Sequence, residues 1–508
     1  MNWATTSRRS RRCVMQVLCS GTQSGPPNEP YRYGVLGLLM WGSVCGAEIE
    51  LSRCDLTASE GRQEVTARCG GLEVALDREH PAGEQIELRV AVVDALAEQA
   101  EPDPLFVIAG GPGDAATGFF AATEGAFSRI LRRRDIVLVD QRGSGASAPL
   151  NCDAFDEDRL GEIVDLEIVV DAAVECLGQL DHDPRFFTTS IAVRDLDEVR
   201  EALGYERVNL YGISYGTRVA QHYLRRYPER TRSVILDGVV SPDIALGPDV
   251  ALASQEALDA LFERCREDQE CRSAYPDLPA RFNAVLDRLG DAPVAVTIDH
   301  PRTGELTETT IDRYTLIAVV RLLIYSPRTA SVLPALVESA YEGDYRALAA
   351  HAMFVSESVE NLAQGLNYAV ACTEDAPYTG DVDFDALAAT YMGTTFVDAL
   401  NRVCERWPAG TMDEDLRELV ETDVPVLLLS GELDPITPPR YASAAAARMT
   451  NTIDIVGRGQ GHGMLTVACA QGLMAKFVDR PDADELDLGC VDRIRPFPLF
   501  TSPMGPAP

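Results

Sequence analysis

The sequence predicts an α/β fold, a mostly parallel doubly wound sheet with an inserted, mainly helical cap. Short apolar runs such as 104–109 and 135–140 alternate with helical patterns up to about residue 241, and another run follows at 424–431. Residues 242–414 differ, because they are rich in Ala, Leu, Glu and Arg at helical spacing. A chain of 508 residues is long enough to bury a core of this kind and to carry such an insertion.

These patterns divide the chain into four segments. We expect a leader with a signal peptide at 1–47, the N-terminal part of the core at 48–241, the helical cap at 242–414 and the C-terminal part of the core at 415–508. The cap would then lie between two strands of one sheet.

The first candidate for chemistry is a sharp turn between a strand and a helix. An apolar run ends in Gly212-Ile213-Ser214-Tyr215-Gly216, and a helical pattern follows. A serine hydroxyl becomes an effective nucleophile when such a turn exposes it at a helix N-terminus beside a base. Glycines leave room for the turn and for close packing of the helix on the strand. Ser214 is therefore the predicted nucleophile, although a lone motif of this kind also occurs as an ordinary turn.

A glycine-rich loop supplies what a serine nucleophile needs next. The run 104–109 opens directly into Gly110-Gly111-Pro112-Gly113. Acyl transfer requires two backbone amides that stabilise the oxyanion, one from a loop after an early strand and one from the residue after the nucleophile. Gly111 and Tyr215 are the predicted donors. The alternative is a glycine-rich turn that binds nothing.

An acid and a base follow in the C-terminal part of the core. The buried run 424–431 is followed by Asp434, and His462 lies 28 residues later in a glycine-rich loop. A lone aspartate or histidine is more often a surface or capping residue, but the order Ser214, Asp434, His462 is the order that this type of fold requires. We therefore predict a catalytic triad. No histidine or cysteine cluster has the spacing of metal ligands, so we expect no catalytic metal and no cofactor.

Another motif, Asp140-Gln-Arg142-Gly-Ser-Gly, follows the run 135–140. Its charged residues are expected to fix the loops around the site by charge-assisted hydrogen bonds rather than to touch the reacting atoms.

The charge excludes some partners. With 45 basic and 79 acidic residues, the formal net charge is −34. Such acidity argues against nucleic acid or an anionic membrane surface as a partner.

The N-terminal segment indicates export. The apolar stretch Tyr33–Val44 follows several arginines and precedes Cys45-Gly46-Ala47, which resembles a secretory signal with a small-residue cleavage site. The stretch is too short to span a bilayer comfortably, so we expect no stable membrane insertion after cleavage and a periplasmic or secreted bacterial protein. A buried helix and a lipoprotein anchored at Cys45 remain alternatives, and the start codon and cleavage site stay open.

The cysteines agree with export. Cleavage near Ala47 would leave ten cysteines, and an even number in an exported chain suggests disulfides. The sequence does not fix their connectivity. Pairing of neighbours is one arrangement: Cys54 with Cys69, Cys152 with Cys176, Cys265 with Cys271, Cys372 with Cys404, and Cys469 with Cys490.

The motifs GGPG, DQRGSGAS, GISYGTRVA and the segment from GELDPITPP to GQGHG together resemble the α/β-hydrolase peptidases of the proline iminopeptidase and tripeptidyl aminopeptidase group. The resemblance extends from Cys69 to Cys490 and is strongest to the exported, cysteine-bearing branch. It implies the roles given above for the triad and for both oxyanion donors. One position departs from the pattern, since Ala109 stands where proline iminopeptidases usually place a histidine, which argues against a strict preference for N-terminal proline.

The resemblance implies an exported serine exopeptidase that releases amino acids or short peptides from a peptide substrate with a free N-terminus. Recognition of the α-amine requires carboxylates, and Glu374 and Asp375 in the cap are the candidates; the alternative is that they form a solvated acidic turn. An esterase or lipase-like enzyme for small esters is the main functional alternative, because a triad alone does not choose between amide and ester. A catalytically inactive relative that only binds ligands would lack a triad residue, and none is missing.

Overall fold

The computed structural model describes residues 48–58, 63–152, 166–360, 362–380, 382–482, 486–502 and 504–506, which belong to one compact unit, Gly46–Pro508. The predicted leader, including the apolar stretch 33–44 and Cys45, lies outside these residues. Among the residues described, no helix combines the length and apolarity needed to cross a bilayer.

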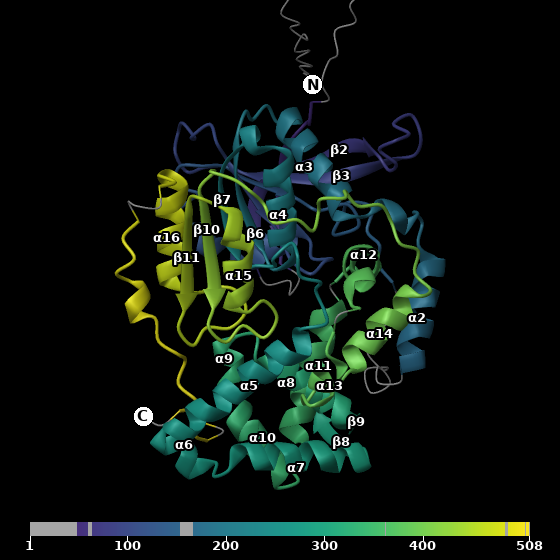
Figure 1. The fold of residues 1–508 in the computed structure, drawn as a ribbon, viewed down its shortest axis with the longest axis vertical. Helices are drawn as coiled ribbons and strands as arrows, with labels where there is room; N and C mark the ends of the chain where they lie inside the picture. The colour runs from purple at the N-terminus through teal and green to yellow at the C-terminus, as the bar shows by residue number, and fades with distance from the viewer. Residues whose placement is uncertain are drawn as a thin grey trace, which may run out of the picture. The chain divides into compact units, whose positions relative to one another are not determined.

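A nine-stranded sheet forms the centre of the molecule, in the order β1-β2-β3-β5-β4-β6-β7-β10-β11 (Figure 1). The strands from β1 to β5 in this order pair antiparallel, and those from β5 to β11 pair parallel. The prediction of a mostly parallel α/β sheet is confirmed. The strands of this sheet are β1 (Ser52–Thr57), β2 (Glu64–Ala75), β3 (Gln85–Val93), β4 (Leu105–Ile108), β5 (Ile136–Val139), β6 (Val208–Ile213), β7 (Thr231–Asp237), β10 (Val426–Gly431) and β11 (Thr452–Gly457).

Helices cover both faces of the sheet, because the central strands are apolar on both sides. Along β10, Val426 and Leu428 belong to one hydrophobic cluster, while Leu427 and Leu429 belong to another. Alternate residues of a strand point to opposite faces, so each cluster marks one face. The helices of this part are α1 (Ala116–Phe127), α2 (Leu166–Gln179), α3 (Thr189–Ala202), α4 (Tyr215–Arg226), α15 (Pro439–Ala445) and α16 (Ala468–Asp479), with α1 against α16 and α3 against α4.

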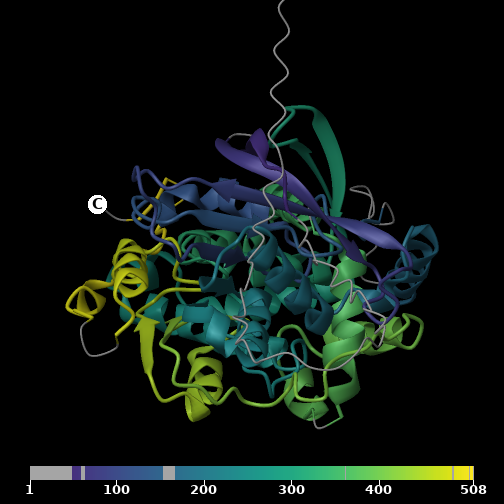
Figure 2. The same cartoon turned by 90° about the horizontal axis from the view of Figure 1, so that it is seen from above.

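The segment between β7 and β10 is mainly helical and has a hydrophobic cluster of its own, below the sheet in Figure 1. It also contains a two-stranded antiparallel sheet, the green arrows at the upper right of Figure 2, which the helical periodicity does not predict. The boundaries at 242 and 414 stay predictions. The elements are α5 (Val250–Glu267), α6 (Gln269–Ala274), α7 (Leu278–Asp291), β8 (Val294–Asp299), β9 (Leu306–Ile311), α8 (Arg313–Leu323), α9 (Pro327–Ala330), α10 (Leu333–Tyr341), α11 (Arg346–Glu360), α12 (Gln364–Val370), α13 (Phe384–Ala388) and α14 (Thr395–Cys404).

Five disulfides join the ten cysteines that follow residue 47. They pair neighbours in the sequence, which confirms that arrangement among those left open. Disulfides persist in oxidising compartments, so this framework favours a protein that works outside the cytosol.

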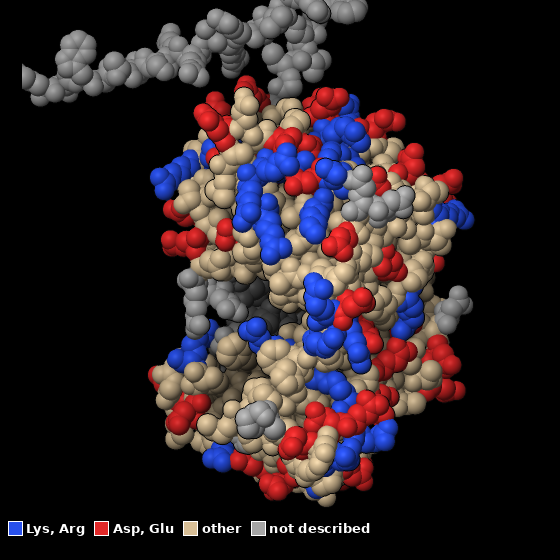
Figure 3. All heavy atoms as spheres, turned by 90° about the vertical axis from the view of Figure 1, so that its left-hand side faces the viewer, with Lys and Arg blue, Asp and Glu red and all other residues tan. Residues whose placement is uncertain are grey.

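One face of the molecule carries many basic residues despite the net negative charge. On the side that carries α16, basic residues gather over the core, and Arg129, Arg132, Arg133 and Lys476 line one pocket there (Figure 3). The same view shows a hollow in the surface at the level where the core meets the cap.

Candidate active site

Ser214 occupies a strained turn between β6 and α4. Its backbone has φ 54° and ψ −125°, a conformation that residues with a side chain rarely adopt. The surrounding glycines make this turn possible: a Cβ on Gly216 would lie 2.5 Å from the backbone oxygen of Ala109, and one on Gly212 would collide with the Gly216 carbonyl. The geometry is that of a nucleophile elbow, which holds the serine hydroxyl at the end of the strand.

The glycine-rich loop after β4 packs directly on this serine. A Cβ on Gly110 would lie 3.1 Å from the Cβ of Ser214. Gly111 has a φ of 102°, which favours glycine, and Tyr215 begins α4, where the first amides have no acceptor within the helix. Among the described residues, neither the Gly111 nor the Tyr215 amide donates a hydrogen bond. Both predicted oxyanion donors are therefore free to bind a carbonyl oxygen.

Asp434 and His462 meet at the carboxyl ends of β10 and β11. Nδ1 of His462 lies 2.9 Å and 3.0 Å from the two carboxylate oxygens of Asp434. Burial alone would raise the pKa of Asp434, but the charge and hydrogen bond of His462 and the amides of Ile436 and Thr437 hold it below its usual range. Asp434 is therefore ionised and orients the imidazole.

The imidazole of His462 is itself more basic than usual. Burial lowers its pKa, but the charges of Asp434 and Asp237 and the hydrogen bond from Nδ1 outweigh burial and raise it. A base of this kind suits the removal of a serine proton at neutral pH.

Thr437 completes the acid side of the site and was not predicted. Its hydroxyl donates to Asp434 over 2.8 Å and lies 3.2 Å from Nδ1 of His462, while its backbone amide also donates to Asp434 over 2.8 Å. The signal in the sequence is a threonine three residues after the acid, in Asp434-Pro-Ile-Thr437.

Ser214 and His462 contact the same turn at the end of β7. The Ser214 amide donates to the carbonyl of Asp237 over 2.9 Å, and a Cβ on Gly238 would lie 3.1 Å from Cε1 of His462. No hydrogen bond joins the Ser214 hydroxyl to His462 among the described residues. Such bonds are often long in enzymes without substrate and tighten when the substrate binds. The structure thus pairs the predicted acid and base and places the predicted nucleophile at the turn that the base also contacts.

The comparisons with known proteins agree with this geometry. A model of the α/β hydrolase fold family matches residues 103–465, which is more than half of the chain. The chain belongs to the α/β-hydrolase family. Its catalytic class is therefore that of a hydrolase, as the order of the triad residues predicts.

Curated relatives of this α/β-hydrolase carry peptidase names. The chain is 28% identical to the serine protease Hip1 of Mycobacterium tuberculosis H37Rv over 77% of this chain and 81% of Hip1. It is 24% identical to a tripeptidyl aminopeptidase of Streptomyces coelicolor over 85% of this chain and 84% of that protein. A carboxylesterase B of M. tuberculosis is 34% identical, but over only 35% of this chain and 37% of the relative. The resemblance to the peptidase group is thereby confirmed.

The predicted amine-binding carboxylates of the α/β-hydrolase are buried and bound to other residues of the chain. Glu374 is fully buried and accepts hydrogen bonds from the amide and hydroxyl of Thr189, while Asp375 pairs with Arg218 at 2.7 Å. The Thr189 hydroxyl also lies 2.7 Å from the hydroxyl of Tyr215. The alternative of a solvated acidic turn is wrong, because both carboxylates are buried; amine recognition by them stays a prediction that their contacts with protein groups do not support. Both carboxylates hold the helix that follows Ser214.

A single turn of π-helix, Ala371–Asp375, presents these two carboxylates side by side. The disulfide Cys372–Cys404 ties this turn to α14. In the predicted oxyanion hole, Tyr215 is thus supported by residues from the segment between β7 and β10, which the sequence motifs alone do not reveal.

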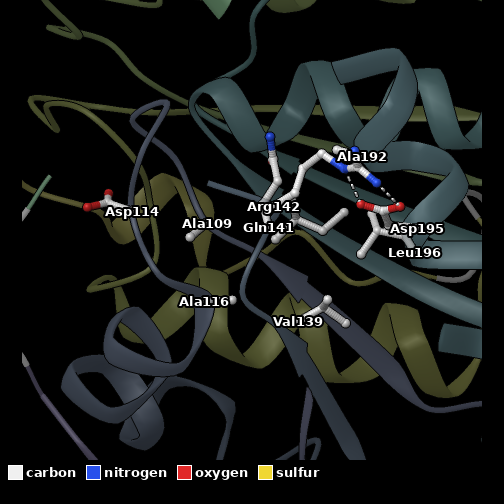
Figure 4. Close-up of a pocket in the computed structure, with 10 residues that line it drawn as sticks. Ala109, Asp114, Ala116, Val139, Gln141, Arg142, Ala192, Asp195 and Leu196 are labelled. Carbon is white, nitrogen blue, oxygen red and sulfur yellow. Dashed lines mark hydrogen bonds and ion pairs between the residues drawn. The ribbon is translucent and has the colours of Figure 1, made fainter. Parts of the chain in front are cut away.

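Asp114 has the properties that the predicted amine-binding carboxylates lack. It follows the oxyanion loop, and burial raises its pKa. Figure 4 shows its carboxylate on the opposite side of the pocket from the ion pair of Arg142 and Asp195, and no described residue donates a hydrogen bond to it or pairs with it. Asp114 is therefore a recessed carboxylate without a partner among the described residues.

The Asp140 to Arg142 motif has the contacts expected of a structural element. Arg142 is completely buried and donates to both oxygens of Asp195, at 2.6 and 2.7 Å, and to the carbonyls of Leu76 and Phe186. The carboxylate of Asp140 accepts from the Thr117 amide and hydroxyl. These bonds tie the motif to α1, which follows the glycine-rich loop, and to α3.

One group in the described part of the chain has the composition of a metal site. His222, Asp413 and Asp415 lie close enough to share an ion. Arg226 already pairs with both carboxylates, and burial lowers the pKa of His222 to about 4. We therefore assign these residues to an ion-pair network that joins α4 to Asp413 and Asp415, and not to a metal site.

Proposed function

We propose that this α/β-hydrolase is an exported serine aminopeptidase that releases amino acids or short peptides from the N-terminus of a peptide substrate. The observation that carries the proposal is the strained turn of Ser214, which packs on the glycine-rich loop and lies at the same end of β7 as His462, the histidine that Asp434 orients. The two peptidase relatives, each covering more than three quarters of the chain, support the choice of peptide over ester.

The proposed mechanism is acyl transfer in two steps. His462 takes the proton from the Ser214 hydroxyl as the oxygen attacks the substrate carbonyl, and the Gly111 and Tyr215 amides stabilise the resulting oxyanion. His462 then gives the proton to the leaving amine, and the peptide bond breaks. A water molecule, deprotonated by the same histidine, then attacks the acyl-enzyme; the bond to Ser214 breaks, the histidine returns the proton to the Ser214 oxygen, and the N-terminal fragment is released. Asp434 stays ionised and stabilises the imidazolium.

Recognition of the free amine is assigned to Asp114. An α-ammonium group bound there would neutralise a recessed carboxylate that has no partner among the described residues, beside the loop that carries Gly111. The five disulfides support the exported part of the proposal.

Two assays on the purified, oxidised protein test the proposal. A fluorophosphonate probe is expected to label the wild type but not Ser214→Ala, since the probe reacts with activated serines. A peptide library digested by the wild type and analysed by mass spectrometry is expected to lose fragments of uniform length from free N-termini. Rapid hydrolysis of short acyl esters without any cleavage of peptides or aminoacyl arylamides would favour the esterase alternative. Absence of labelling would favour a ligand-binding protein.

A further inference from the structure

One arginine near the site has aromatic partners instead of acidic ones. Arg321 lies in the last turn of α8, with its guanidinium carbon 5.7 Å from the ring centre of Tyr325 and 5.5 Å from that of Phe396. Its only hydrogen bond to a described residue is a long one, 3.3 Å, to the Tyr325 hydroxyl. Aromatic faces stabilise a guanidinium and keep it planar and fixed in place.

Arg321 is incompletely satisfied. Its Nε is buried and has no hydrogen-bond partner, and no carboxylate of the described residues pairs with it. Buried donors are normally hydrogen-bonded, and this chain has 79 acidic residues for 45 basic ones. A fixed guanidinium whose Nε has no acceptor, in so acidic a chain, can still bind an anionic group.

The positive charge of Arg321 is close enough to His462, the predicted base, to affect its pKa. The ring of Tyr325 and the imidazole of His462 pack edge to face, with ring centres 5.3 Å apart. The backbone carbonyl of Tyr325 also accepts a hydrogen bond from the His462 amide over 2.7 Å. Arg321 is among the groups that act on the pKa of His462, where its positive charge opposes the raising effect of Asp434 and Asp237. The free guanidinium and the reacting atoms therefore share one neighbourhood.

We propose that Arg321 is a specificity-determining residue that binds a carboxylate of the substrate, an inference that rests on the peptidase function proposed above. A planar guanidinium binds a carboxylate through two parallel hydrogen bonds, and Nε is one of the two donors on the side of the fork used for such bonds. Two parts of a peptide carry this group: an acidic side chain, and the free C-terminus of a short peptide. Either would place its negative charge beside the Arg321 guanidinium.

Two pairs of substrates test the proposal. Peptides with Glu or the isosteric Gln at each position near the scissile bond report on side chains, and short peptides with a free or an amidated C-terminus report on the terminal carboxylate. We expect the acid member of one pair to have a kcat/KM about ten- to a hundredfold higher in the wild type. In Arg321→Gln that ratio should fall to about one, and Arg321→Lys should retain part of it. The pair that shows the ratio identifies the source of the carboxylate.

Arg328→Gln is the matched control. Arg328 is an exposed arginine of the same cap and lies over the ring of Phe497, so its loss should leave the ratio unchanged. A ratio near one in the wild type for both pairs, or a ratio that survives in Arg321→Gln, would overturn the proposal.

The pH profile of kcat/KM distinguishes an effect of the Arg321 charge from an effect of its packing. Removal of its charge should let the pKa of His462 rise, so the acid limb of the kcat/KM profile should move to higher pH in Arg321→Gln but not in Arg321→Lys. The titratable or charged groups that act on His462 are Asp434, Asp237 and Arg321, and only the last differs between these variants. An unchanged limb in Arg321→Gln would count against the proposal.

Failure of the peptidase function can be told apart from failure of this inference. If no peptide is cleaved by any variant, the peptidase proposal fails. Binding is then measured without turnover, as protection of Ser214 from a fluorophosphonate by a peptide acid or by its amide. Better protection by the acid in the wild type, lost in Arg321→Gln, would support the carboxylate subsite, and equal protection would exclude it.

Discussion

The carboxylate of Asp237 accepts a hydrogen bond of 2.6 Å from the backbone amide of Met464, two residues after His462. Its other oxygen accepts the Tyr211 hydroxyl over 2.9 Å, and its carbonyl accepts the Ser214 amide. One buried residue at the end of β7 thus contacts both the loop of the nucleophile and the loop of the base. Burial raises the pKa of Asp237 to about 6, so it is ionised at neutral pH.

Asp237→Asn should extend activity to lower pH. The negative charge of Asp237 is one of the causes that raise the pKa of His462, whereas the asparagine oxygen can still accept from Met464. Loss of the charge lowers the pKa of His462, so the base stays neutral to a lower pH. We expect the acid limb of kcat/KM to move to lower pH. The variant Glu73→Gln, which changes an exposed carboxylate in β2, should show no shift.

Thr437→Val should reduce kcat about tenfold with little change in KM. Valine has nearly the same shape but cannot donate to Asp434, so the acid loses one of the bonds that fix its orientation toward His462. Thr437→Ser keeps the hydroxyl and should retain most of the activity. Steady-state kinetics on an aminoacyl or peptidyl arylamide measure both variants. Equal activity of Thr437→Val and the wild type would mean that the backbone amides alone hold Asp434.

Asp375→Asn should destabilise the fold without changing amine recognition. Asp375 and the guanidinium of Arg218 are both almost completely buried, and loss of the Asp375 charge leaves the guanidinium only the longer ion pair with Glu374, at 3.4 Å. The expected loss is about 3 to 5 kcal/mol in the free energy of unfolding, measured by chemical denaturation under oxidising conditions. KM for peptides with free and acetylated N-termini should keep the same ratio. A selective loss for the free amine would support the prediction that the sequence suggests.

Asp114→Asn should weaken recognition of the free amine without destabilising the fold. The substitution removes the negative charge and keeps the shape, so the fold should lose little stability while the free α-ammonium loses its counter-ion. We expect kcat/KM to fall about tenfold or more for peptides with a free N-terminus and to stay unchanged for acetylated ones. The preference for a free amine would then largely disappear. If that preference survives in Asp114→Asn, another residue recognises the amine.

The sequence predicts the parts of this site that have strict local requirements. The elbow glycines next to Ser214 are needed because the backbone of neighbouring elements leaves no room for a Cβ, and such requirements appear in the sequence as motifs. Asp434 and His462 are found because each follows a short apolar strand. Parallel strands carry their functional residues at their carboxyl ends, so position along the chain is enough.

Other parts depend on contacts between distant segments, which periodicity does not show. Glu374 and Asp375 look like a polar turn in the sequence, yet the partners that bury them, Thr189 and Arg218, come from residues more than 150 positions earlier. Arg321 lies in an ordinary helical pattern, and its nearness to His462 arises only when α8 packs against the loop of the base. The β8–β9 hairpin was missed because a short two-stranded insertion between helices leaves only a weak pattern of alternation.

Gly111→Ala tests the oxyanion loop directly. At a φ of 102°, alanine is strained, and its Cβ would lie 2.5 Å from the amide nitrogen of Gly113, so the loop must move and carry the Gly111 amide with it. We expect kcat to fall about a hundredfold or more, because one of two oxyanion donors is displaced. Gly125→Ala is the matched control: nothing lies within 4 Å of the new Cβ in α1, and alanine favours a helix by about 1 kcal/mol. That variant should be fully active and slightly more stable. If the two variants had the same kcat, the Gly111 amide would not be an oxyanion donor.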